Sequence, residues 1–188
     1  MKALFGTDGI RGEAGSFPLD AKTVKQIGFL LVSLLKKRDH GTPTIVIGRD
    51  TRESGPWLEQ ALIEGASNAN ATCYAAGVIT TPGVAFLTRS LNADAGIVIS
   101  ASHNPYHDNG IKIFSPSGQK LDDSVEKSIE ESVFAGTTEV GPPSPAGFQV
   151  SVDRGLVEKY VSYLTSQIGA GLSLSGLRMV VDCANGAS

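Results

Sequence analysis

Residues 95–100, Ala-Gly-Ile-Val-Ile-Ser, decide the fold class, because they form an apolar run with no polar alternation. A strand of this kind is typical of a sheet that is covered on both faces, as parallel sheets are. Residues 44–48, Thr-Ile-Val-Ile-Gly, have the same character, and residues 71–76 and 177–182 are further strand candidates. Around a Ser-Pro-Ser-Gly turn, residues 111–121 predict an antiparallel hairpin at one edge. The sequence therefore predicts a buried sheet.

Segments with helical periodicity separate the predicted strands. Asp20 can cap a helix in which apolar residues recur at helical spacing up to Leu35. Further helices are predicted from Ser54, from Thr80 and over residues 123–134. Strands that alternate with helices predict an α/β fold with a mixed, mostly parallel sheet covered by helices.

The length of 188 residues fits one domain and part of a second. Residues 141–147, Gly-Pro-Pro-Ser-Pro-Ala-Gly, cannot continue a helix. They predict a boundary between a first domain, residues 1–150, and the start of a second, residues 151–188. The buried-type strand at residues 177–182 needs partner strands and covering helices that do not follow it in the sequence. We therefore expect the chain to be a truncated piece of a longer protein.

Composition excludes several classes of protein. Sixteen Lys and Arg against 19 Asp and Glu give a net charge of −3, so no nucleic acid is expected as a partner. The longest apolar run, residues 27–35, is too short to span a membrane, and no signal peptide follows Met1. The two cysteines, Cys73 and Cys183, have neither metal-binding nor redox spacing, so we expect a cytoplasmic protein. The sequence carries no signal for an oligomeric state.

Residues 99–112, Ile-Ser-Ala-Ser-His-Asn-Pro-Tyr-His-Asp-Asn-Gly-Ile-Lys, are the segment richest in reactive groups. They follow a predicted strand, and in open α/β sheets ligands bind beyond the carboxyl ends of the strands. The turn-forming dipeptides Asn104-Pro105 and Asn109-Gly110 would hold Ser102 on an exposed tip. One interpretation is a polar surface loop whose Asn and Asp side chains satisfy their own backbone.

Two chemical interpretations of this loop fit its residues poorly. Ser102, His103 and Asp108 could form a hydrolase triad, but triad partners normally come from separate elements, and the sequence has no G-x-S-x-G turn. His103, His107 and Asp108 could bind zinc. However, two histidines at this spacing need a helix, and Pro105 lies between them.

A third interpretation is that Ser102 accepts or carries a phosphoryl group, with Lys112 and nearby arginines offsetting its charge. Residues 48–55, Gly-Arg-Asp-Thr-Arg-Glu-Ser-Gly, fit this chemistry. They place Arg49 and Arg52 between a predicted strand and the start of a helix, where backbone N–H groups and guanidinium donors can meet an anion. An internally paired surface loop is the alternative for this segment.

Residues 5–12, Phe-Gly-Thr-Asp-Gly-Ile-Arg-Gly, have glycines that permit close backbone approach and one arginine, Arg11, that could reach a phosphate. A plain Asp-Gly turn is the alternative. Together with residues 48–52, 100–105 and 108–112, this segment resembles the alpha-D-phosphohexomutase superfamily in order and spacing. The resemblance spans the whole chain.

The resemblance implies an isomerase, an intramolecular phosphotransferase that acts through a phosphoserine and a bisphosphate intermediate. The forms of the first loop and of the serine loop are most similar to bacterial members that act on hexosamine phosphates in cell-wall precursor synthesis. Members that act on glucose or mannose phosphates are the alternative. The resemblance, with the loop positions above, implies catalytic roles for Ser102, Arg11, Lys112 and His103, and substrate or phosphate binding by Asn104, Arg49 and Arg52.

The resemblance also implies a Mg2+ ion, ligated through the phosphate on Ser102. The superfamily holds this ion with three aspartates in an Asp-Gly-Asp-x-Asp-Arg loop, and this sequence contains no Asp-x-Asp. Superfamily motifs of the third and fourth domains that bind sugar and phosphate are absent as well. We therefore expect the chain alone to be inactive. A non-catalytic anion-binding α/β module is the alternative function.

Overall fold

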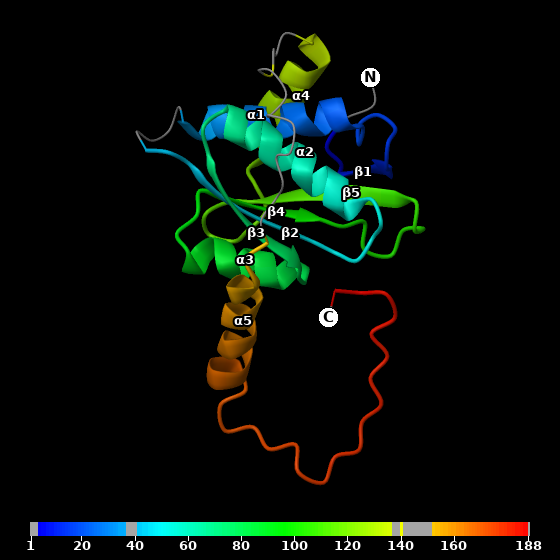
Figure 1. Ribbon diagram of the computed structural model, residues 1–188, viewed down its shortest axis with the longest axis vertical. Helices are drawn as coiled ribbons and strands as arrows, with labels where there is room; N and C mark the ends of the chain where they lie inside the picture. Colours follow the sequence, from blue (N-terminus) through cyan, green and yellow to red (C-terminus); the bar gives the residue numbers. More distant parts are fainter. Residues whose placement is uncertain (1–3, 37–40, 137–139, 141–151, 188) are drawn as a thin grey trace.

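A computed structural model describes residues 4–36, 41–136, 140 and 152–187 of the protein. The described chain forms one five-stranded sheet with helices on both sides (Figure 1). The strands are β1 (Ile10–Glu13), β2 (Thr44–Arg49), β3 (Thr72–Val78), β4 (Ala95–Ile99) and β5 (Asp108–Phe114). The helices are α1 (Ala21–Lys36), α2 (Gly55–Asn68), α3 (Thr81–Ser90), α4 (Asp123–Ala135) and α5 (Arg154–Tyr163), which continues into a π-helical turn, η1 (Leu164–Ile168).

The strand order is β1-β5-β4-β2-β3, and β4 lies at the centre of the sheet. Strands β3, β2 and β4 are parallel to one another. On the far side of β4, β5 pairs antiparallel with β4, and β1 pairs antiparallel with β5. The predicted α/β class and the mixed sheet are therefore confirmed. The parallel strands place their carboxyl ends along one edge, where ligands of open α/β sheets bind.

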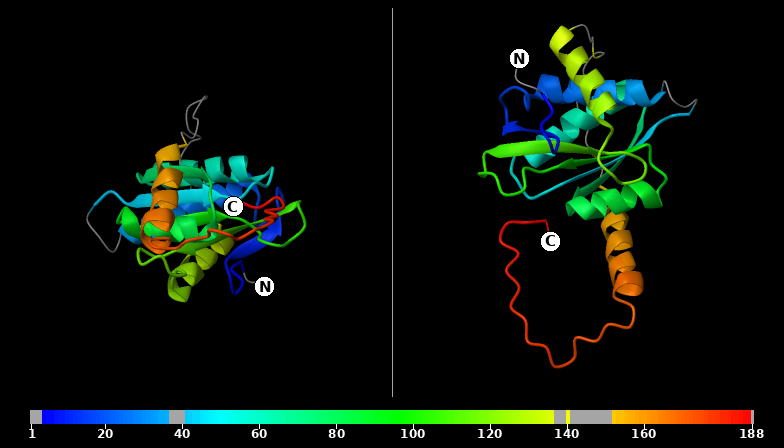
Figure 2. Two further views of the ribbon diagram at one scale, coloured as in Figure 1. Left: turned by 90° about the horizontal axis from the view of Figure 1, so that it is seen from below. Right: turned by 180° about the vertical axis from the view of Figure 1, so that it is seen from behind.

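The two faces of the sheet are covered by different helices. Helices α1, α2 and α4 cover one face and enclose the larger apolar core, while α3 and α5 lie on the other face (Figure 2). Side chains along β4 alternate between the two cores, with Ile97 and Ile99 in the larger and Val98 in the smaller. In the part of the chain that the structure describes, no helix combines the length and the apolar character needed to cross a bilayer.

The edge of the sheet differs from the prediction. The chain does reverse after Phe114, but residues 119–121 form only an isolated bridge, between Phe114 and Lys120, and no strand. The antiparallel edge strand is instead β1, which pairs with β5. Periodicity did not reveal β1 because it has only four residues, and glycine and charged residues interrupt its apolar pattern.

The C-terminal part also differs from the prediction. Apolar residues at helical spacing between Val157 and Ile168 lie in α5 and η1, and Phe86 of α3 stacks on Tyr163, the last residue of α5, with ring centroids 4.3 Å apart. Residues 177–182 form no strand, because the described chain offers them neither a neighbouring strand nor a covering helix. The Pro-rich residues 141–147 lie outside the described residues, and the domain boundary at residue 150 stays a prediction.

Candidate functional site

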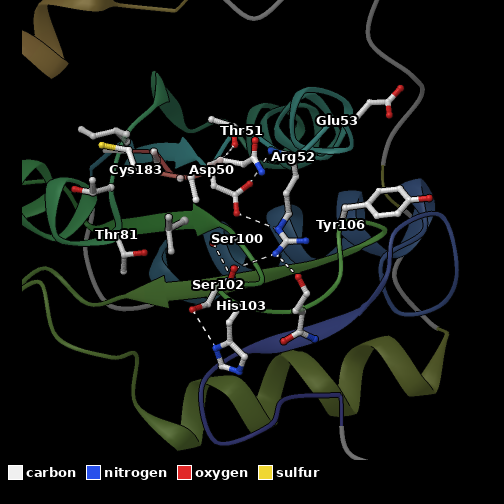
Figure 3. A pocket seen from close by; sticks show the side chains of 18 residues that line it. Asp50, Thr51, Arg52, Glu53, Thr81, Ser100, Ser102, His103, Tyr106 and Cys183 are labelled. Atoms are coloured by element: carbon white, nitrogen blue, oxygen red, sulfur yellow. Dashed lines mark hydrogen bonds and ion pairs between the residues drawn. The ribbon is translucent and has the colours of Figure 1, made fainter. Parts of the chain in front are cut away.

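The serine loop, residues 100–107, lies where the carboxyl end of β4 turns into β5. Ser102 stands at its tip with φ 57°, a left-handed conformation that is unfavourable for a residue with a Cβ. Its backbone N–H donates to Ser100 Oγ at 3.1 Å, and its own Oγ lies 3.5 Å from His103 Nδ1. The exposed serine hydroxyl thus has a ring nitrogen beside it, as Figure 3 shows.

Ser102 lines a cleft of about 1000 Å³. The serine loop forms one wall and the loop after β2 another. The last described residues, 183–187, complete the cleft, and the Thr51 hydroxyl donates a hydrogen bond to the Asn185 carbonyl. The cleft therefore lies beyond the carboxyl ends of β2 and β4, the position predicted for a ligand site.

Arg52 connects the two loops. Its Nη1 donates to the carbonyls of Pro105 (2.5 Å) and Asp108 (2.9 Å), and its Nη2 to those of Ser102 (3.0 Å) and Asn104 (2.9 Å). These contacts cross from one loop to the other, and the dashed lines in Figure 3 mark part of this set. The guanidinium therefore fixes the path of the main chain from Ser102 to Asp108.

Further hydrogen bonds connect the loop after β2 with the two strands that flank the serine loop. The backbone N–H of Asp50 donates to the Ile99 carbonyl at 3.0 Å, and the Asn109 amide donates to Ser54 Oγ at 2.8 Å. Asn109 is fully buried, and its carbonyl oxygen accepts from the Gly110 N–H. Because the buried Asn109 side chain makes both of these hydrogen bonds, it holds the start of β5 and the loop after β2 in a single arrangement.

Arg11 and Lys112 come together through the register of the sheet. Arg11 pairs with Gly110 and Lys112 with Val98, so the two basic side chains project from the same face. Asp8 Oδ2 joins them, at 2.5 Å from Lys112 Nζ and 3.2 Å from Arg11 Nη2. The hydrogen bond from Lys112 is the main reason that the pKa of Asp8 lies below its usual value.

This group of charges is connected to the serine loop. Arg11 Nη1 donates to the Asn104 side-chain carbonyl at 3.3 Å, and the Asn104 amide group donates to Asp108 Oδ2 at 2.9 Å. Arg11 and Lys112, predicted from two distant motifs, are thus brought together, and Asn104 connects them to the loop that carries Ser102. Asp8 is the member of this group that was not predicted, although its position three residues before Arg11 was a signal.

Arg49 lies apart from these residues. Its Nε is 3.2 Å from Glu59 Oε2, and its Nη1 donates to the Asp50 carbonyl. Among the described residues that line the cleft, Arg52 is present, whereas Arg49, Arg11 and Lys112 are not. Burial raises the pKa of Glu59 in spite of the neighbouring guanidinium. Arg49, at the end of β2, therefore forms a nearly buried ion pair with Glu59 of α2.

The two poorly fitting chemical interpretations can be compared with this geometry. His103 lies beside Ser102, but the Asp108 carboxylate accepts from Asn104 and lies 3.6 Å from His107 Nε2, so it does not orient His103 in a triad. Within the described ranges, no three His, Cys, Asp or Glu side chains are grouped as a metal site requires. The arrangement therefore favours neither a hydrolase triad nor a zinc site.

Fold and site together define an α/β unit with an exposed serine beyond β4, on a loop that Arg52 clamps and that Arg11 contacts through Asn104, an arrangement suited to a phosphoryl group. Comparison with known proteins agrees. The chain belongs to the family described as "Phosphoglucomutase/phosphomannomutase, alpha/beta/alpha domain I", which it matches over residues 2–140. The predicted superfamily resemblance is thereby confirmed.

Similar proteins carry related names. The chain is 47% identical to a phosphoglucosamine mutase of Koribacter versatilis and 46% identical to one of Syntrophobacter fumaroxidans, in each case over its whole length. A solved phosphoglucomutase/phosphomannomutase family protein from Burkholderia thailandensis superposes with a TM-score of 0.69 at 26% identity, over 87% of this chain and 35% of that one. The chain spans 41% and 42% of the lengths of the two phosphoglucosamine mutases.

Proposed function

We propose that this chain is part of a phosphoglucosamine mutase, an isomerase that interconverts glucosamine 6-phosphate and glucosamine 1-phosphate. The observation that carries the proposal is Ser102, held at the tip of a clamped loop that Arg11 contacts through Asn104, with Lys112 joined to Arg11 through Asp8. The phosphoglucosamine mutases that match the whole chain support the choice of substrate. Phosphoglucomutase and phosphomannomutase activities are the alternatives within the family.

In the proposed reaction, Ser102 carries the phosphoryl group. The bond between Ser102 Oγ and phosphorus breaks as a sugar hydroxyl forms a bond to the same phosphorus, and the proton lost by the hydroxyl is returned to the serine oxygen. The resulting sugar bisphosphate reorients and gives its other phosphoryl group back to Ser102. Arg11, Lys112 and His103 would stabilise the developing charge and assist proton transfer, while Asn104 lines the loop.

The described residues do not provide a complete Mg2+ site, because they contain no suitable group of three acidic or metal-binding side chains. One oxygen of phosphorylated Ser102 could serve as a ligand, but octahedral Mg2+ needs more carboxylate or water oxygens. We propose that these ligands come from the rest of the intact protein. The chain alone is then unable to turn over substrate. We also propose that the intact protein is cytoplasmic.

The test is to measure mutase activity in the intact gene product that contains this chain. Glucosamine 6-phosphate should be converted faster than glucose or mannose phosphates, and Ser102→Ala should lower the rate at least about a thousandfold because the nucleophile is lost. Ser117→Ala, on an exposed turn away from the cleft, is the matched control and should retain activity. Faster turnover of glucose or mannose phosphates would support the alternatives.

Activity in a preparation that contains only these 188 residues would contradict the proposed incompleteness of the chain. A phosphate-binding intact protein without mutase activity toward any hexose phosphate would favour the non-catalytic anion-binding module. In that case Ser102→Ala would leave phosphate affinity nearly unchanged, since a module of this kind does not need the serine nucleophile.

A further inference from the structure

We propose that Arg52 is a positioning residue for Ser102 and does not bind the substrate phosphate. The inference rests on the proposed function, because it assigns Arg52 a part in the phosphoryl-transfer step. It also replaces the expectation from sequence, in which Arg52 was a candidate phosphate ligand. The direction of each N–H of the guanidinium supports this role.

An arginine side chain has five N–H donors, and in Arg52 each has an acceptor within the protein. Besides the four carbonyl contacts already described, Nε donates to Asp50 Oδ2 at 3.2 Å. The side chain is only 11% exposed. A phosphate oxygen could bind Arg52 only by displacing one of these acceptors, whereas the side chains of Arg11 and Lys112 are 30% and 17% exposed and pair with an exposed carboxylate, that of Asp8.

The carbonyls that Arg52 binds belong to the residues that set the direction of Ser102. They are the carbonyls of Ser102 itself and of Asn104, Pro105 and Asp108, so the clamp spans the whole tip of the loop. Ser102 adopts a left-handed conformation that disfavours a non-glycine residue, and such a conformation persists only when surrounding contacts fix it. We infer that the Arg52 contacts supply this restraint.

Asp50 holds Arg52 in turn. Its carboxylate accepts from the Arg52 backbone N–H at 3.0 Å as well as from Nε, so one carboxylate fixes both ends of the arginine. The planar fork of a guanidinium can bind several carbonyls with fixed angles, which a lysine ammonium cannot. A lysine at this position would therefore keep the positive charge and lose most of the clamp.

In-line phosphoryl transfer depends on the placement of the attacking and leaving oxygens, and misplacement by about 1 Å can lower the rate by about 100-fold. A loosened Ser102 would thus slow transfer. Substrate affinity, which depends on other cations, would change little. A phosphate ligand would show the opposite pattern, in which affinity falls and a lysine partly substitutes for the arginine.

A first experiment needs no activity and uses the 188-residue chain. Backbone hydrogen exchange is compared in wild type, Arg52→Lys and Arg52→Gln, with Arg89→Lys on the exposed face of α3 as the matched control. The amides of Asn104 and Asp108, which donate within the loop, should exchange at least about tenfold faster in both Arg52 variants. Amides of α1 and α2 should be unchanged. Equal loop protection in all four proteins would overturn the proposal.

A second experiment uses the intact gene product with glucosamine 6-phosphate. Arg52→Lys and Arg52→Gln should both lower kcat by about 100-fold. The Kd of the sugar phosphate should stay within about twofold of wild type. Methylguanidinium added to Arg52→Ala should restore part of the rate, and it should have no effect on Arg52→Lys, where the side chain fills the site. A variant that merely unfolds would not be rescued.

The outcomes separate this inference from the proposed function. Near-normal kcat in Arg52→Lys, or a loss of affinity of about tenfold or more with kcat retained, would show a phosphate ligand and overturn the positioning role. If the wild-type intact protein lacks mutase activity, the proposed function fails. The hydrogen-exchange experiment then still decides whether Arg52 holds the serine loop.

Discussion

Two apolar segments of similar composition differ in burial and in secondary structure in this molecule. Strand β4, Ala95–Ile99, is buried at every residue, whereas residues 177–181 lie in an extended, exposed segment. Ile97 has no exposed surface, and Val180 is fully exposed. Both segments are rich in β-branched or long apolar side chains, so the difference does not come from local preference. It comes from the neighbours that each segment has.

Strand β4 has β2 on one side and β5 on the other, and helices cover both of its faces. Every backbone group and side chain of the strand can therefore find a partner. Residues 177–181 have no such neighbours among the described residues, and their apolar side chains remain in water. The comparison shows that strand formation in this fold depends on tertiary contacts more than on sequence pattern.

The largest expected effect compares the loss of a side chain in each segment. Ile97→Ala should lower the free energy of unfolding by about 3–4 kcal/mol, because it leaves a cavity in the centre of the sheet. Val180→Ala should change it by less than about 0.5 kcal/mol, since the side chain makes no buried contact. Urea unfolding of both variants measures the difference. Equal losses would mean that residues 177–181 are buried in solution.

A second comparison uses two glycines with nearly the same backbone conformation, Gly9 at φ 84° and Gly176 at φ 81°. A Cβ on Gly9 would lie 2.3 Å from the Ile111 carbonyl oxygen, whereas a Cβ on Gly176 would meet nothing within 4 Å. Gly9→Ala should therefore destabilise the fold by about 2–3 kcal/mol, and Gly176→Ala by about 1 kcal/mol or less, the strain of the left-handed residue alone. Thermal unfolding checks both values. A similar loss in both would contradict the close approach of Gly9 to β5.

The smallest expected effect on stability belongs to the comparison of the two thiols, since labelling either one in the folded protein leaves the fold intact. Burial raises the pKa of Cys73, in β3, to about 11, which leaves on the order of one thiol in a thousand ionised at pH 8. Cys183 is exposed at the end of the extended segment. Labelling with a thiol-specific disulfide reagent should be at least about 100-fold slower at Cys73, with Cys73→Ser and Cys183→Ser used to assign the two phases. Labelling of both at one rate would place Cys73 outside the packed unit.

The parallel part of the sheet and its helices could be predicted from sequence. Residues such as Ile45 and Ile97 have no polar alternation, and Thr80 accepts from the Gly83 N–H as the predicted cap of α3. Strand β1 could not be predicted, because its pairing with β5 depends on contacts between residues about a hundred positions apart. The expected strand at residues 177–182 did not form for the same reason, since its pattern alone supplies no partner.

The loops that form the site could be predicted from sequence, but the contacts that individual side chains make there could be predicted less well. The motifs identified Ser102, Arg11 and Lys112, because charged and small residues beyond buried strands indicate a ligand site. They did not separate the arginines, since a repeated arginine in one loop can point in two directions. In the structure Arg49 pairs with Glu59 under α2, and Arg52 clamps the serine loop.

The most direct test of the account is to locate a phosphoryl group on the protein. The intact gene product is incubated with glucosamine 1,6-bisphosphate, and its mass and phosphopeptides are measured before and after phosphatase treatment. We predict a single phosphoryl group on Ser102, removed by phosphatase and absent from Ser102→Ala. A protein that takes up no phosphoryl group, or takes it up at another residue, would contradict the central claim that the clamped loop presents Ser102 for phosphoryl transfer.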